Sequence, residues 1–292
     1  MSMTYKANAY GKINLYLDVL NRLDNGYHNI ESIMQSVSLC DTITLEISDI
    51  QGESIIEIQS SNGIIPNDKT NLVYKCARRF LTHTGINGKR CVFTIDKSIP
   101  VSAGMAGGSS DGATAMNLLN QACGSLLSYS ELCFIGATIG ADIPFCLTGG
   151  TCVCQGIGDR ITKIKPFKDI FLVSAIDHSS VSTPIAFAML DEKYGTECTS
   201  SGNIKNMISA IECENTSAVS SLLYNKFESV IMPTNQNVER IKRIMLDNGA
   251  VGALMSGSGP SVFGIFLDEN SQKKAYDALK NCSINAFLCK TI

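Results

Sequence analysis

The sequence has no long apolar run and no concentration of positive charge. No stretch approaches the ~18 consecutive apolar residues that a membrane-spanning helix requires, so we expect no membrane partner. The first residues, MSMTYKANAYGKIN, lack the apolar core of a secretory signal, and we expect a cytoplasmic protein. A net charge of -3 argues against a broad nucleic-acid surface, which needs clustered Lys and Arg. A small anionic substrate remains compatible, because a few fixed donors create a local positive site.

Paired metal-binding cysteines are also missing. The chain has 12 cysteines, but none are spaced as CxxC. Cys152 and Cys154 are too close together for the usual paired zinc spacing. Most cysteines lie in apolar runs, so we expect buried free thiols in a reducing compartment.

A further absence concerns the stretch IPVSAGMAGGSSDGATAMNLLN, residues 99–120. It has the glycines of a phosphate loop but not the lysine that Walker A requires, and the Rossmann G-x-G-x-x-G pattern is absent too. Glycines just before a helix start allow backbone N–H groups to face an anion, and the helix start adds partial positive charge. We expect Ser109 or Ser110 to cap this helix and Gly124 to end it. The pattern alone does not decide between a phosphate loop and a tight structural turn.

Strand and helix patterns alternate along the chain, which predicts an α/β or α+β protein. The polar segment 163–168 is the best candidate for a boundary between domains at 1–163 and 164–292. Strands are predicted at 13–20, 41–48, 54–60, 90–96 and 170–177; helices at 71–83, 109–123, 130–139, 237–247 and 271–282; and a strand, a Gly-rich turn and a strand across 252–267.

Lys12 is the strongest candidate for the missing positive charge. In an extended segment Tyr10, Lys12 and Asn14 share one face, because side chains alternate. Asp142, flanked by apolar residues, is expected to be held in place and to stay ionised beside a lysine. A second Gly/Ser-rich turn, residues 256–261, suggests a ligand held by two such loops.

Several of these motifs resemble those of a known protein family. PVSAGMAGGSSD resembles the phosphate loop of the GHMP kinases (galactokinase, homoserine, mevalonate and phosphomevalonate kinases), which has no Walker lysine, and MSGSGPSVFGIF resembles their third motif. The blocks AYGKINLYLDVLNRLDNGYH, NLVYKCARRF, GADIPFCLTGGTCVCQGIGD and VSTPIAF extend the resemblance over nearly the whole chain. They are similar to the branch of that family that phosphorylates a cytidylyl-linked methylerythritol. Met105 stands where the family usually has Leu, Ala106 where Gly is common, and Gly11 where Ala is common.

The resemblance implies a two-domain GHMP kinase fold, with an N-terminal ribosomal-S5-domain-2-like domain and a ferredoxin-like C-terminal domain. It implies transfer of the γ-phosphoryl group of ATP to a 2-hydroxyl in non-mevalonate isoprenoid synthesis, with Mg²⁺ whose ligands the sequence does not assign. Another GHMP kinase of the homoserine or mevalonate type, and a non-catalytic nucleotide-binding relative, remain as alternatives. The sequence leaves open whether the protein is a monomer or a homodimer.

The resemblance also implies site residues. Lys12 and Asp142 match the catalytic pair. Asn14 and Thr183 would line the acceptor site, while Tyr27 and Phe187 would sandwich the cytosine and His28 would hydrogen-bond its edge. The positions that match ATP binding are Lys97, Asn71, Leu72, Pro100, Val101, Ser102, Ala103, Gly104, Met105, Ala106, Gly107, Gly108, Ser109 and Ser110.

Overall fold

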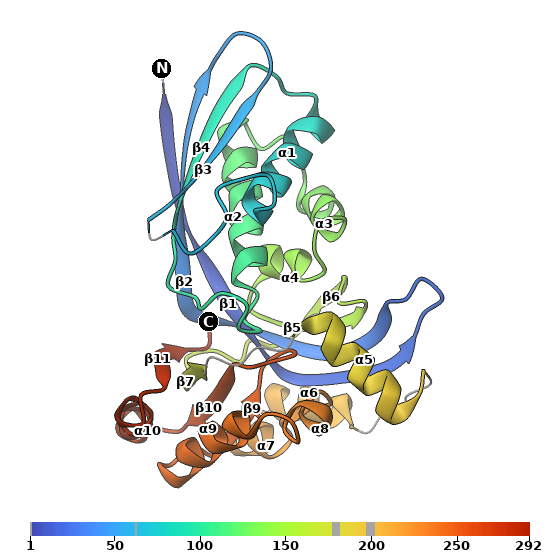
Figure 1. Cartoon of the computed structure of the whole chain (residues 1–292), viewed down its shortest axis with the longest axis vertical. Helices are drawn as coiled ribbons and strands as arrows, with labels where there is room; N and C mark the ends of the chain where they lie inside the picture. The colour runs from blue at the N-terminus through green and yellow to red at the C-terminus, as the bar shows by residue number, and fades with distance from the viewer. Residues whose placement is uncertain (1, 62, 177–181, 197–201) are drawn as a thin grey trace. The chain divides into compact units, whose positions relative to one another are not determined.

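The computed structural model of the chain describes residues 2–61, 63–176, 182–196 and 202–292 (Figure 1). These residues form two compact units that alternate along the chain, so the units are not the predicted segments 1–163 and 164–292, and that division into domains stays a prediction. The first unit comprises the described residues within Met1–Gly11, Cys40–Val101 and Ala106–Thr148, and the second comprises those within Lys12–Leu39, Ser102–Met105 and Gly149–Ile292.

Two long strands, β1 (Met3–Arg22) and β2 (His28–Asp49), contribute residues to both units. The predicted strands 13–20 and 41–48 are therefore parts of longer ones. Strand order in their sheet is β3-β4-β2-β1-β8, and β5 pairs with both β2 and β6. The other strands of this sheet are β3 (Ile55–Ser60), β4 (Lys89–Asp96), β5 (Thr151–Gly156), β6 (Arg160–Lys163) and β8 (Tyr224–Asn225).

The first unit packs its helices on one side of β3 and β4 (Figure 1). Its core joins apolar side chains of β2 and β4 to those of the helices, for example Leu45 and Phe93 to Phe80 and Met116. This burial supplies most of the driving force for folding. The helices are α1 (Leu72–Thr84), α2 (Gly107–Ala122), α3 (Tyr129–Ala137) and α4 (Ile143–Thr148).

Helix α1 lies within one residue of the predicted helix 71–83 at both ends. The side chain of Asn71 accepts a hydrogen bond from Val73 N–H at 2.8 Å, and Gly85 ends the helix at a φ of 69°. The start of α2 differs from prediction, because the residue before the helix is Ala106, with no side-chain cap, rather than Ser109 or Ser110. Both serines lie in the first turn, and the sequence pattern gave no sign that the helix starts at the glycine pair.

The second unit contains an antiparallel four-stranded sheet in the order β11-β7-β10-β9. Helices α9 (Gln236–Asp247) and α10 (Glu269–Asn281) pack against it and confirm the two predicted helices. The predicted strand, turn and strand across 252–267 is the β9–β10 hairpin. The strands are β7 (Phe171–Ile176), β9 (Gly252–Met255), β10 (Val262–Phe266) and β11 (Asn285–Lys290); residue 177 of the predicted strand lies outside the described residues.

Four further helices in the described part of the second unit were not predicted from sequence periodicity. Two of them, α7 and α8, are only 6 and 4 residues long, which is too short for a helical repeat to show in the sequence. They are α5 (Thr183–Tyr194), α6 (Ile204–Glu212), α7 (Thr216–Ser221) and α8 (Glu228–Ile231).

The cysteines of the described residues are free thiols, as predicted. Burial raises the pKa of Cys76 and of Cys289 to about 12, so both stay protonated and behave as small apolar side chains. Within the described part of the chain, no three His, Cys, Asp or Glu side chains cluster as a metal site. Across those same residues, no helix is both long and apolar enough to span a bilayer.

Candidate functional site

The two Gly/Ser-rich segments of the second unit lie against each other. Ser261 N–H donates to Ala103 O at 3.3 Å, and Ser256 Oγ donates to Gly104 O at 3.1 Å. Gly104 has a φ of +76°, and a Cβ added there would lie 2.4 Å from Ser256 O. Only glycine fits this approach, because any side chain would meet both a backbone clash and an unfavourable φ.

Lys12 lies beside this pair of segments. Its backbone N–H donates to Met105 O at 3.0 Å, and its Nζ donates to Asn14 Oδ1 at 2.7 Å. The residue is only 4% exposed, yet no carboxylate of the described residues lies within ion-pairing distance of its ammonium. A buried charge without a counter-charge is costly, so this ammonium is suited to receive an anion.

Asn14 holds the ammonium in place. Its Nδ2 donates to Ser32 Oγ at 2.9 Å, and its Oδ1 also accepts from Gly257 N–H at 3.1 Å. Lys12 and Asn14 therefore share one face of β1, as the alternation of side chains predicted. The amide fixes the Lys12 ammonium next to the second Gly/Ser-rich turn, where an added Cβ on Gly257 would lie 3.7 Å from Lys12 Nζ.

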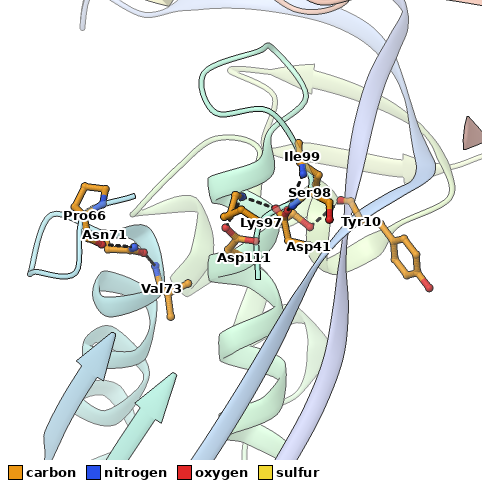
Figure 2. A network of polar contacts seen from close by, with 10 residues as sticks. Tyr10, Asp41, Pro66, Asn71, Val73, Lys97, Ser98, Ile99 and Asp111 are labelled. Carbon is orange, nitrogen blue, oxygen red and sulfur yellow. Dashed lines mark hydrogen bonds and ion pairs between the residues drawn. The ribbon is translucent and has the colours of Figure 1, made fainter. Parts of the chain in front are cut away.

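In the first unit, a cluster of charges lies between the end of β4 and the start of α2 (Figure 2). Lys97 Nζ pairs with Asp41 Oδ2 and, at 2.8 Å, with Asp111 Oδ2. Asp41 Oδ1 in turn accepts from the backbone N–H groups of Ser98 at 2.6 Å and Ile99 at 2.8 Å. All three charged side chains are at least 96% buried. One ammonium thus serves two buried carboxylates, and the Lys97 predicted to contact ATP is already paired.

Asp111 is the member of the cluster whose carboxylate is least well satisfied. Its Oδ1 is buried without a hydrogen-bond partner among the described residues. Burial raises the pKa of Asp111 to about 7; Lys97 opposes that rise, and the nearby Asp41 carboxylate adds to it. Sequence reasoning missed Asp41 and Asp111 as members of this site. They are 70 residues apart in the sequence, and no local pattern pairs them.

The start of α2 is built on unusual backbone. Ala106 has a φ of 55° and a ψ of 29°, a left-handed conformation that an L-residue other than glycine adopts at a cost. An added Cβ on Gly107 would lie 3.2 Å from Lys97 Nζ, so the glycine lets the helix start approach the charge cluster. Ser110 Oγ donates to Tyr10 O at 2.7 Å, which ties the first turn of α2 to β1.

Asn71 and Leu72, the candidates for the adenine edge, begin α1. Asn71 uses both ends of its amide within the chain, because Nδ2 donates to Pro66 O at 2.8 Å and Oδ1 accepts from Val73 N–H (Figure 2). A Cβ added on Gly108 would lie 3.4 Å from Leu72 Cδ1. Leu72 therefore lies beside the first turn of α2, and Asn71 acts as a helix cap in this structure.

Asp142 directly precedes α4. Its backbone O accepts from Cys146 N–H at 3.0 Å, and its half-buried carboxylate has no hydrogen-bond or ion-pair partner among the described residues. The carboxylate is therefore available to a ligand. Asp142 belongs to the first unit and Lys12 to the second, so the predicted pairing of these side chains stays a prediction.

The predicted acceptor residues of the second unit come from several elements: Asn14 from β1, His28 from the start of β2 with Tyr27 just before it, and Thr183 and Phe187 from α5. The His28 ring stacks on Phe187 with centroids 4.4 Å apart and planes 12° apart, and Phe227 meets the Phe187 ring edge-on. Tyr27 is 58% exposed. The sandwich of Tyr27 and Phe187 stays a prediction, and in this structure His28 covers one face of Phe187. Thr183 Oγ1 lies 2.9 Å from Ser258 Oγ, which joins α5 to the second Gly/Ser-rich turn.

Comparison with family models finds two matches. Residues 71–150 match the GHMP kinases N terminal domain, and residues 206–285 match the GHMP kinases C terminal domain. The phosphate-loop segment lies in the first match, and the second Gly/Ser-rich turn lies in the second.

Similar proteins cover the chain from end to end. A 4-diphosphocytidyl-2-C-methyl-D-erythritol kinase of Clostridium tetani is 38% identical over 98% of this chain and 100% of its own length. One of Caldicellulosiruptor saccharolyticus is 42% identical over 93% of this chain and 91% of its own. A crystal structure of a 4-(cytidine 5'-diphospho)-2C-methyl-D-erythritol kinase superposes with a TM-score of 0.81 at 25% identity, covering 98% of this chain and 99% of that one. The chain therefore belongs to the 4-diphosphocytidyl-2-C-methyl-D-erythritol kinase family of the GHMP kinases.

Proposed function

We propose that this chain transfers the γ-phosphoryl group of ATP to the 2-hydroxyl of 4-diphosphocytidyl-2-C-methyl-D-erythritol, giving the 2-phosphate and ADP. The reaction belongs to non-mevalonate isoprenoid synthesis, and we assign it to the cytoplasm. The names and full-length similarity of the relatives support the substrate. The observation that carries the chemistry is the buried ammonium of Lys12, which has no ion-pair partner in the described part of the chain and lies beside a glycine-rich segment.

Lys12 supplies positive charge at the transferring phosphoryl group. Phosphoryl transfer depends on positioning and charge stabilisation more than on covalent chemistry. A buried ammonium stabilises an anion strongly because little water screens it. Asn14, bonded to Lys12, keeps that ammonium from turning away, so the charge is in place before the substrates bind.

Asp142 accepts the hydrogen bond of the attacking hydroxyl and takes up its proton. A carboxylate is a weak base, with an ordinary pKa of about 4, so orientation of the hydroxyl is its larger contribution and proton uptake comes late. The absence of a partner for this carboxylate among the described residues leaves both of its oxygens available for that role.

The phosphates of ATP bind to backbone N–H groups at residues 100–110 and at the start of α2. Such groups carry partial positive charge and do not need a Walker lysine. Mg²⁺ would enter with ATP and would be held mainly by the substrate phosphates and water, which this ion prefers to an all-protein cage. The ion would supply charge neutralisation at the phosphates. Lys97 acts here by holding Asp41 and Asp111 and so fixing the start of α2.

The acceptor binds to residues of the second unit. Phe187 offers the aromatic surface that the stacked His28 ring leaves uncovered, and His28 offers a hydrogen-bonding edge for the cytosine, with Tyr27 as the second aromatic ring. Asn14 and Thr183 face the polyol. We also propose domains at 1–163 and 164–292, because the two family models fall on either side of that boundary.

An ADP-release assay across acceptors tests this proposal. We expect turnover with the cytidylyl-linked acceptor and none with homoserine or mevalonate, the acceptors of the alternative GHMP kinases. Turnover with one of the latter would replace the proposed substrate. Absence of ADP release with all of them would favour a non-catalytic nucleotide-binding relative.

Lys12→Met tests the role of the ammonium, because methionine keeps an unbranched chain without the charge. We expect a loss of turnover of about 10²-fold or more with the fold retained. Lys6→Met is the matched control, since Lys6 is exposed on the same strand. Near-normal turnover of Lys12→Met would remove the ammonium from the mechanism.

A further inference from the structure

Asp191, which no motif singled out, contacts the candidate cytosine-binding histidine. Its Oδ1 lies 2.8 Å from His28 Nε2, and its Oδ2 accepts from Arg22 at 3.2 Å. The His28 side chain is 7% exposed and that of Asp191 is 19% exposed, so water competes little for this hydrogen bond. The two residues are 163 positions apart in the sequence.

Helix α5 holds the imidazole in two ways at once. Phe187 and Asp191 are four residues apart on α5, so they lie on the same face of the helix. Phe187 stacks on the plane of the His28 ring, and Asp191 bonds its Nε2. The stack fixes the plane of the ring, and the hydrogen bond fixes its rotation within that plane.

The Asp191 contact also decides which ring nitrogen carries the proton. A carboxylate only accepts hydrogen bonds, so Nε2 must be the donor. In the neutral imidazole, Nδ1 then keeps its lone pair. Nδ1 has no hydrogen-bond partner among the described residues and is left for a ligand.

We propose that Asp191 is a positioning residue that selects cytosine over uracil by fixing the tautomer of His28. A bare Nδ1 accepts a hydrogen bond from the exocyclic amine of cytosine, whereas uracil has a carbonyl oxygen at that position and the two acceptors repel. Arg22 holds the second oxygen of Asp191 and keeps the carboxylate turned toward the ring. This inference rests on the proposed function, because it concerns the base of the proposed acceptor.

The tautomer is measured first, without substrate. The chain has only three histidines, so imidazole ¹⁵N resonances of the full-length protein are resolvable, and His28→Gln assigns those of His28. At about pH 8.5, where an imidazole is ordinarily neutral, we expect the His28 proton on Nε2 in the unaltered chain and on both nitrogens in exchange in Asp191→Ala. A proton fixed on Nδ1 in the unaltered chain would overturn the proposal.

Base selection is measured next, as kcat/KM for the cytidylyl-linked acceptor divided by that for its uridylyl-linked analogue. We expect Asp191→Ala to lower this ratio about tenfold or more, with the loss mainly in the acceptor KM and with the ATP KM within about twofold of normal. Glu192→Ala, which removes the neighbouring exposed acid of α5, should leave the ratio unchanged.

An unchanged ratio in Asp191→Ala would reduce Asp191 to a structural contact. If the unaltered chain releases no ADP with the cytidylyl-linked acceptor, the proposed substrate fails, and the ¹⁵N spectra still decide whether Asp191 sets the tautomer.

Discussion

The buried carboxylate of Asp111 makes the stability of the chain depend on pH in a way that one substitution removes. Lys97 carries one positive charge between two buried carboxylates, so the ionised cluster has a net negative charge. The pKa of Asp111 is raised from 3.8 to about 7, chiefly by burial. Asp111→Asn keeps the shape of the side chain, leaves Lys97 paired with Asp41, and removes the surplus charge.

The sign and size of the change in the free energy of unfolding with pH follow from the pKa values of Asp111 in the unfolded and folded states. The folded state holds the Asp111 proton more tightly than the unfolded state, so the free energy of unfolding is highest below the unfolded pKa of 3.8 and falls as the pH rises through 7. At about 1.4 kcal/mol per pKa unit, the total loss is about 4 kcal/mol, of which about 2–3 kcal/mol falls between about pH 5 and about pH 8. The amide introduced by Asp111→Asn does not titrate, so the variant avoids this loss.

Urea unfolding of both chains at about pH 5 and about pH 8 measures the difference. We expect the free energy of unfolding of Asp111→Asn, relative to the unaltered chain, to rise by about 2–3 kcal/mol between these two conditions. Asp277→Asn is the control, because it removes an exposed carboxylate of α10. Parallel pH profiles for the unaltered chain and Asp111→Asn would refute the reasoning and show that the cluster accommodates both charges.

Three other substitutions test the site. Asp142→Asn should lower turnover by about 10²–10⁴-fold while ATP binding and thermal stability persist, because the amide cannot take up the hydroxyl proton; near-normal turnover would exclude Asp142 from the mechanism. Phe187→Ala should raise the KM of the cytidylyl-linked acceptor far more than that of ATP, because it removes the aromatic face, and equal effects on the two KM values would count against base stacking. Ala106→Gly should raise the free energy of unfolding in urea by about 0.5–1 kcal/mol, because glycine adopts a φ of 55° without strain. A destabilised variant would show that the gain in entropy of the unfolded state outweighs the strain relieved in the folded state.

Patterns within short stretches of the sequence predicted the helices and strands of several segments well. The extent of α1, the β9–β10 hairpin, and the shared face of Lys12 and Asn14 all depend on neighbours within a few residues. The predicted start of α2 was wrong, because a serine is usually the better cap, whereas α2 begins at Gly107 after the left-handed Ala106, which has no capping side chain. The roles of the site residues stay predictions that the experiments above address.

The sequence by itself determined the family, the alternation of strands and helices, and the lysine-free glycine loop. Tertiary structure decided which charges have partners. Lys97 is shared by Asp41 and Asp111, 56 and 14 residues away, whereas Lys12 is buried with an amide and no described carboxylate. His28 meets Asp191 across 163 residues. Such pairings arise only when strand register and helix packing bring distant side chains together. Burial then strengthens each pair that forms and makes each unpaired charge costly.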